Sequence, residues 1–290
     1  MTPLYPTAGA YLGAPERRVL LFGMSGLGKT HIARMLRASG RWFHYSVDYR
    51  IGTRYMGELI ADDFKRHAMR VPYLRDLLLT DSIWIGSNIT FENLAPLSRY
   101  LGRPGDPERG GLPFAEYLRR QESHREAEIA ALLDTRRFIE RAKAIYGYPH
   151  FVCDTGGSIC EVVDPEDPAD PVMTALAADH LLVWIEGSDA HAEALCARFD
   201  RAPKPMYYRP EVLVPLWEAW VAEHGPEERV DPDAFVRHAY RRAIAERRPR
   251  YEAMSRWGVA VSGDEVARVG SPEAFDALLA EALARRVEAA

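Results

Sequence analysis

The sequence predicts an α/β fold: a doubly wound, five-stranded parallel sheet that carries a large helical insertion. Three observations predict it. Five short apolar runs have the character of buried strands, helical sequence separates them, and a glycine-rich motif lies between the first run and the first helix. The 290 residues, of which 47% are hydrophobic and 27% charged, suit one large globular domain or two smaller ones.

Each expected strand is a short run of apolar, β-branched or aromatic residues that ends at a glycine or a polar residue. The runs cover 18–22, 42–47, 149–153, 181–185 and 258–261. The second run ends at Asp48 and the third at Asp154. Apolar residues recur at helical spacing from Lys29 onward, so the order strand, glycine turn, helix and strand predicts a βαβ unit at the start of the chain.

The stretch between the second and third strands is far longer than one crossover helix needs. Helical patterns occur in it at 57–69, 72–79, 113–133 and 135–146. A second helical patch follows the fourth strand, where Asp231 is expected to cap a helix that has Pro232 in its first turn. The sequence therefore predicts a core of 1–53, 149–210 and 251–290, a lid or acceptor subdomain at 54–148 and a helical patch at 211–250.

Composition excludes several classes of protein. The net charge of −5 argues against a general nucleic-acid binder. The three cysteines, Cys153, Cys160 and Cys196, are too few for a disulfide framework and lack the pairing of a zinc site, which favours the cytoplasm. The first residues lack the pattern of a secretory signal, and no apolar run is long enough to cross a membrane.

One motif carries specific chemistry. The residues from Gly23 to Thr30 read Gly-Met-Ser-Gly-Leu-Gly-Lys-Thr, a full match to G-x-x-x-x-G-K-[ST] between a strand and a helix. Glycines let the backbone curl so that successive N–H groups point at phosphate oxygens, and the helix start adds its positive dipole end. The expected nucleotide-contacting residues are Gly23, Ser25, Gly26, Leu27, Gly28, Lys29, Thr30 and His31. The motif predicts a P-loop NTPase fold that binds a nucleoside triphosphate.

Within that loop, Lys29 is expected to reach the β- and γ-phosphates and the Thr30 hydroxyl to coordinate Mg²⁺. The chain lacks the signature motifs of other P-loop classes. The chain has no Asn-Lys-x-Asp guanine reader and no Leu-Ser-Gly-Gly-Gln sequence, and no glutamate follows Asp154 at the end of the third strand. These absences favour a group-transfer enzyme over a hydrolytic motor.

The variant G-x-x-G-x-G-K-T resembles the P-loop small-molecule kinases, the group of shikimate, gluconate and nucleoside monophosphate kinases. In that group the second strand delivers Asp-x-Asp, and the third ends in a triple-glycine turn. This chain has Asp48-Tyr49-Arg50 at the first place and keeps two glycines, Gly156 and Gly157, at the second. Because the second carboxylate is missing, shikimate itself is not the expected acceptor. The resemblance implies ATP and Mg²⁺ as cofactors.

The resemblance also implies an arginine-bearing lid after the fourth strand, where Arg198 and Arg201 lie three residues apart. We expect them to hold the transferred phosphoryl group, with solvated surface arginines as the alternative. Asp48 is expected to accept the acceptor's proton or to hold a magnesium-bound water, and Asp154 to join the metal's shell. Turn capping by either carboxylate is the alternative.

Weaker expectations concern an acceptor site. Arg50 and Arg54 suit an anionic acceptor, although ion pairs with nearby acidic residues explain them almost as well. The turn at Gly156 and Gly157 lets a ligand approach the backbone closely, or is simply a tight turn. The arginine run that includes Arg247, interleaved with glutamates, is expected to form a solvated face.

The sequence thus predicts an ATP-dependent kinase that moves the γ-phosphoryl group of ATP to an unidentified acceptor. The alternatives are a P-loop ATPase that acts as a switch or assembly factor on a protein or nucleic-acid partner, a kinase with a large acceptor, and a binding module without activity. Nucleic acid and membranes are not the expected partners of the kinase.

Overall fold

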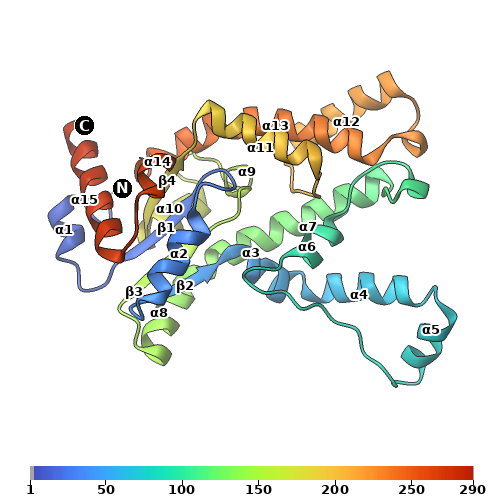
Figure 1. Ribbon diagram of the computed structural model, residues 1–290, viewed down its shortest axis with the longest axis horizontal. Helices are drawn as coiled ribbons and strands as arrows, with labels where there is room; N and C mark the ends of the chain where they lie inside the picture. Colours follow the sequence, from blue (N-terminus) through green and yellow to red (C-terminus); the bar gives the residue numbers. More distant parts are fainter. Residues whose placement is uncertain (1–2, 290) are drawn as a thin grey trace. The chain divides into compact units, whose positions relative to one another are not determined.

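A computed structural model describes residues 3–289, and within them the five predicted strands form one sheet (Figure 1). All neighbouring strands are parallel, and their order in the sheet is β2-β3-β1-β4-β5. The strands are β1 Arg18–Phe22, β2 Trp42–Ser46, β3 His150–Asp154, β4 Leu181–Glu186 and β5 Val259–Ser262. The predicted α/β fold with a five-stranded parallel sheet is confirmed.

Burial explains why the central strands are continuous apolar runs. Four of the five residues of β1 and all five of β3 are buried, as is every residue of β4 except its last. Leu20 of β1 lies between Cys153 of β3 and Leu182 of β4 in the register. Strands of a parallel sheet are covered on both faces, so their side chains are apolar in both directions. In the edge strand β5 an exposed alanine alternates with buried valines.

The chain changes direction across the sheet at β1. It runs from β1 past β3 to β2, and then returns through β3 to β4 and β5 on the other side. Ligands of open α/β sheets bind outside the carboxyl ends of the strands at such a switch point. The glycine-rich loop leaves the carboxyl end of β1, so the topology puts it there.

The chain forms two compact units. Unit 1 contains residues 1–47, 132–202 and 240–290, and unit 2 contains 48–131 and 203–239. Unit 1 holds the sheet with α1 Ala8–Leu12, α2 Lys29–Ala38, α8 Thr135–Tyr146, α9 Ile159–Val162, α10 Pro171–Asp179, α11 Asp189–Arg201, α14 Gly263–Ala267 and α15 Pro272–Ala289. The long helix α13 Pro232–Ser255 contributes its residues 240–255.

Helix α8 lies in the predicted insertion, yet it belongs with the sheet because its aromatic side chains pack on β2. The ring of Phe138 lies 5.0 Å from that of Tyr45 and 6.3 Å from that of Phe43. Elsewhere in unit 1, Tyr11 and Arg17 both bond Asp276 of α15, which ties the first helix to the last.

Unit 2 is helical. It contains α4 Gly57–Ala68, α5 Pro72–Leu79, α6 Ala95–Leu101, most of α7 Phe114–Leu133, α12 Pro210–His224 and the start of α13. The predicted helices at 57–69, 72–79 and 113–133 are confirmed, and α6 is an addition that the sequence analysis did not predict. Asp231 caps α13 as predicted, because its carboxylate accepts the backbone N–H of Asp233 at 2.9 Å.

The second strand ends earlier than predicted. It stops at Ser46, and Asp48 lies in the one-turn helix α3 Val47–Arg50, which continues into the π-helix Ile51–Tyr55. The prediction that Asp48 ends a strand is therefore wrong. Valine 47 is fully buried and starts the helix in spite of its β-branched side chain. None of the helices in residues 3–289 has the length and apolarity of a membrane span.

Candidate nucleotide-binding site

The glycine-rich loop joins β1 to α2 in a tightly curled path. Gly23, Gly26 and Gly28 have φ angles of 136°, 81° and 92°, which residues with side chains rarely adopt. Gly28 caps the amino end of α2. Positive φ angles at three positions curl the backbone tightly at the start of α2, as an anion cradle built from loop amides requires.

Gly23 shows why the loop begins with glycine. A side chain there would place its Cβ 2.5 Å from the carbonyl oxygen of Ile185 in β4. No rotation of a side chain relieves such a contact, because the backbone fixes the Cβ position and the carbonyl oxygen is a backbone atom. The first turn of the loop therefore depends on the absence of a side chain at Gly23.

Lys29 reaches back into the curl of the loop. Its Nζ donates to the carbonyl oxygens of Gly23 at 2.8 Å and Met24 at 2.9 Å, and only 6% of the residue is exposed. A buried ammonium group has to be paired or hydrogen-bonded. The loop therefore holds a positive charge at its centre, and the predicted contact of Lys29 with phosphates stays a prediction.

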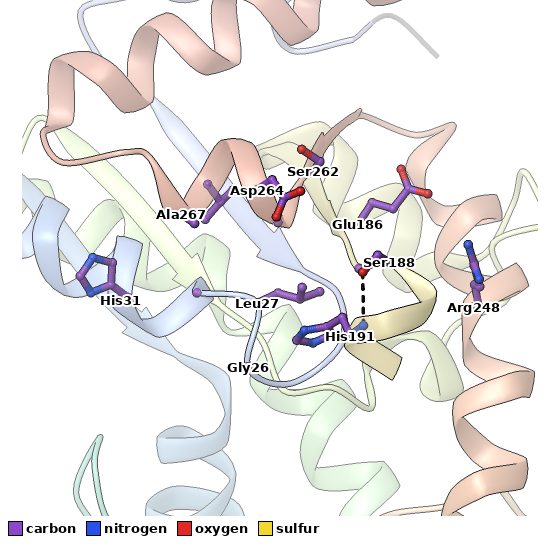
Figure 2. Close-up of a pocket in the computed structure, with 14 residues that line it drawn as sticks. Gly26, Leu27, His31, Glu186, Ser188, His191, Arg248, Ser262, Asp264 and Ala267 are labelled. Carbon is purple, nitrogen blue, oxygen red and sulfur yellow. Dashed lines mark hydrogen bonds between the residues drawn. The ribbon is translucent and has the colours of Figure 1, made fainter. Parts of the chain in front are cut away.

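A cavity of about 440 Å³ lies beside the loop (Figure 2). The loop contributes Gly26, Leu27 and Gly28 to its wall, and the start of α2 contributes His31. The rest of the wall comes from Arg248 of α13 and from the ends of β4 and β5 with the residues that follow them, namely Glu186, Gly187, Ser188, His191, Ser262, Gly263, Asp264, Val266 and Ala267. The cavity is roomy enough for part of a small ligand and adjoins the phosphate-type loop directly.

Helix α11 connects this cavity to the loop. Ser188 caps the helix by accepting the backbone N–H of His191 at 3.2 Å, the bond drawn in Figure 2. The ring Nε2 of His191 lies 3.1 Å from the carbonyl oxygen of Ser25. Since a carbonyl only accepts, this ring nitrogen donates, and it fixes the amino end of α11 against the loop.

The predicted lid arginines lie near the carboxyl end of the same helix, and both are exposed. Arg198 approaches the loop, since its Nη2 lies 3.5 Å from the place where a Cβ at Gly26 would be. Arg201 follows one turn later. Arg198 is therefore at the loop in this structure, while the role of Arg201 stays a prediction.

Asp154 is the last residue of β3 and is buried, with 6% exposure. It pairs in register with Leu21, near the end of the strand from which the loop departs. Its Oδ2 lies 3.8 Å from Nε2 of His44 in β2. Residues 3–289 contain no cluster of three or more His, Cys, Asp or Glu side chains that would hold a metal by itself.

A site for Mg²⁺ does not need a cluster of protein ligands. Mg²⁺ is usually bound by one or two carboxylates together with substrate phosphates and waters, not by a cage of protein ligands. Asp154, at the carboxyl end of its strand, and Thr30, half-buried in the first turn of α2, have the oxygen chemistry that this arrangement needs.

Arg247 is the residue that the sequence analysis missed. It lies on α13 with 3% exposure and forms an ion pair with Glu161 of α9. Burial alone would lower the pKa of the guanidinium, but the Glu161 carboxylate reverses this and the pKa is raised. The prediction of a solvated arginine face is therefore wrong at Arg247. Helical spacing was the sequence signal that could have indicated this burial. Buried side chains recur around Arg247 on the same helix, at Tyr240, Ala243, Ile244, Tyr251 and Met254.

The turn after β3 lies under this part of α13. Gly157 accepts a hydrogen bond at its carbonyl oxygen from the Tyr251 hydroxyl, at 2.6 Å. A Cβ at Gly157 would lie 3.8 Å from each of three atoms: Nη1 of Arg247, the backbone nitrogen of Ser25 and the Tyr251 hydroxyl. Burial raises the pKa of the nearby Cys160 thiol to about 12, so this cysteine is a neutral core group and not a nucleophile. The neighbouring Gly156 is buried.

The remaining predicted residues belong to unit 2. Asp48 is in the first turn of α3, and Arg50 ends that helix with its guanidinium 5.5 Å from the ring centre of Tyr55. Arg54 is exposed on the π-helix. Their roles toward an acceptor stay predictions.

No known protein-family model matches this chain, and no curated protein sequence does. Among solved structures, shikimate kinase from Bacteroides thetaiotaomicron is similar to it. The match covers 94% of this chain and 97% of that chain, with 15% identical residues and a TM-score of 0.37. What this chain binds therefore has to be inferred from its own loop, cavity and charged side chains.

Proposed function

We propose that the chain binds ATP at the Gly23–Thr30 loop and transfers its γ-phosphoryl group to a hydroxyl or phosphate of a small acceptor. The observation that carries the proposal is the curled loop with a buried lysine at its centre. Three left-handed glycines, the start of α2 and the Lys29 ammonium together make a site for a polyphosphate.

The cavity beside the loop suits the nucleoside. It adjoins Gly26 and Gly28, so a ligand whose phosphates occupy the loop has room for its base and sugar there. Thr30 and Asp154 would hold Mg²⁺, which shields phosphate charge when bound. ATP is the proposed nucleotide because the chain contains no guanine-reading motif.

In the proposed reaction, the bond between the γ-phosphorus and the β–γ bridging oxygen breaks, and that oxygen leaves on ADP. The acceptor oxygen forms the new bond to phosphorus, and its proton passes to a base, a role that the sequence alone predicts for Asp48. Lys29 neutralises the charge that develops on the phosphates, and Arg198 at the edge of the loop adds a second cation.

One observation favours the alternative, an ATPase that acts on a protein partner. The segment 69–84 of unit 2 exposes large apolar side chains, namely Met69, Val71, Tyr73, Leu79 and Trp84. Exposed apolar groups gathered in one segment are typical of partner-binding surfaces. An ATPase releases ADP and inorganic phosphate in equal amounts, whereas a kinase given its acceptor releases ADP without phosphate. Measuring both products therefore separates the two.

Nucleotide binding itself is tested by thermal unfolding with a non-hydrolysable ATP analogue and Mg²⁺. The wild-type melting temperature should rise, because a ligand that binds the native state stabilises it. Lys29→Ala should abolish the rise. Lys65→Ala, which removes an exposed lysine paired with Asp62, is the matched control and should keep it. A full rise in the Lys29→Ala variant would contradict the assignment of the loop.

A further inference from the structure

Arg247 is buried in an ion pair with Glu161. A solvated arginine keeps its hydration and has no desolvation penalty. A buried ion pair has one, and it is often no more stable than apolar residues of similar size. The Arg247–Glu161 pair has 4% and 5% of its side chains exposed. The pair therefore adds little stability over an apolar replacement, so stability alone does not account for a charged pair at this place.

The guanidinium lies beside the phosphate loop. Its Nη1 and the backbone nitrogen of Ser25, a loop amide, are each 3.8 Å from the point where Gly157 lacks a Cβ. The two nitrogens are therefore at most 7.6 Å (twice 3.8 Å) apart, a span that one phosphate group can bridge when each nitrogen bonds a different oxygen. Arg247 is about as buried as Lys29, at 3% against 6% exposure.

The surrounding contacts hold this arginine in place. Its Nε donates to Glu161, so one edge of the guanidinium is fixed by a carboxylate. Three residues later, Arg250 donates to the carbonyl oxygens of Cys160 and Val163, both at 2.6 Å. The Tyr251 hydroxyl holds the carbonyl of Gly157. Side chains of α13 thus hold the segment from Gly157 to Val163 by hydrogen bonds.

We propose that Arg247 contacts the terminal phosphate of a nucleoside triphosphate bound in the loop, and that Glu161 is the positioning residue that orients it. This inference rests on the proposed function. It assigns recognition of the third phosphate to a helix outside the glycine-rich motif. The donor is preorganised, so it loses little side-chain entropy when the phosphate arrives.

The test compares the affinities for a non-hydrolysable ATP analogue and for ADP, each with Mg²⁺, by calorimetry. Arg247→Ala alone would leave the Glu161 carboxylate buried without its partner and can unfold the chain. The informative variant is therefore the double substitution E161M/R247M, which replaces the pair by apolar side chains. Arg241→Met is the control, because it removes an exposed arginine of the same helix that pairs with Asp200.

The double variant should bind the ATP analogue about 10- to 100-fold more weakly, the range for a lost hydrogen bond to a charged group, and ADP nearly as well as the wild type. Arg241→Met should change neither affinity. If the folded double variant keeps the wild-type ratio of the two affinities, the pair is structural and the inference is overturned. If wild-type protein binds neither nucleotide, or Lys29→Ala binds both, the proposed function fails as well.

Discussion

Among residues 3–289, each unit buries one arginine in an ion pair, and the two arginines have different surroundings. In unit 2, Arg120 of α7 uses all three of its nitrogens within the protein. Nε donates to Glu116 at 2.7 Å, Nη2 donates to Asp63 at 2.8 Å, and Nη1 donates to the carbonyl oxygen of Tyr100. The guanidinium also lies 4.6 Å from the ring centre of Tyr100. Arg120 therefore ties α4, α6 and α7 together.

In unit 1, Arg247 pairs with Glu161 and faces a turn that carries no side chain at Gly157, next to a loop amide. Two arginines of nearly equal burial are thus surrounded by different chemistry. Burial by itself does not separate a structural ion pair from a ligand-binding one. The surroundings differ instead: the guanidinium of Arg120 is bonded within unit 2 by Glu116, Asp63 and Tyr100, whereas Arg247 lies near the amide of Ser25 in the loop that we propose binds phosphate.

The largest expected effect on stability is at the structural arginine. Arg120→Met removes the hydrogen-bonded arginine of the buried Asp63 carboxylate and leaves only His67, 3.8 Å away, so the free energy of unfolding should fall by about 3–5 kcal/mol. Arg119→Met is the control, since this half-exposed arginine contacts the same Glu116 and should cost less than about 1 kcal/mol. Urea unfolding measures both. A similar loss of unfolding free energy in the two variants would contradict the structural role of Arg120.

Two glycines allow a matched test of the backbone in each unit. A Cβ at Gly23 would lie 2.5 Å from the Ile185 carbonyl oxygen, and a Cβ at Gly105 would lie 2.5 Å from the Val230 carbonyl oxygen. Both have a left-handed φ, so either Gly→Ala change should cost at least about 1–3 kcal/mol. Only Gly23→Ala should also lose the ATP-analogue melting shift. Loss of that shift in Gly105→Ala would contradict the assignment of the site to unit 1.

The smallest expected effect is a difference in acid stability. Burial lowers the pKa of His150 and of His180, both in unit 1, to about 4. An unfolded histidine has a pKa near 6.5, so the unfolded state binds more protons and unit 1 loses stability as the pH falls from about 6.5 to about 4.

In unit 2, hydrogen bonds from Arg119 and Arg120 lower the pKa of Glu116 to about 2, against desolvation. That contribution is complete above about pH 4.5 and is lost only as the pH falls toward 2. Hydrogen exchange followed by mass spectrometry at pH 7 and pH 5 should therefore show earlier loss of protection in the sheet than in α4 and α7. Equal loss in both units would contradict this.

Much of the sheet was predictable from local sequence. The runs of β1, β3 and β4 are apolar throughout because they are covered on both faces, and the loop is readable because phosphate binding needs glycine, lysine and threonine at set spacings. The end of β2 was less readable, since the β-branched Val47 continues the strand pattern while the backbone already turns into α3. Helix α6 was missed because seven residues carry little periodic signal.

By itself the sequence determined where the strands lie, where the glycine-rich loop is, and that Lys29 and Thr30 open a helix. These features depend on neighbouring residues, through side-chain spacing and allowed backbone angles. Only the tertiary structure decided that Arg247 is buried beside Gly157 and that Arg198 approaches Gly26. Those contacts join segments far apart in the chain, and the physical reason is packing: which face of α11 or α13 is covered depends on the strands and turns that the fold brings beneath it.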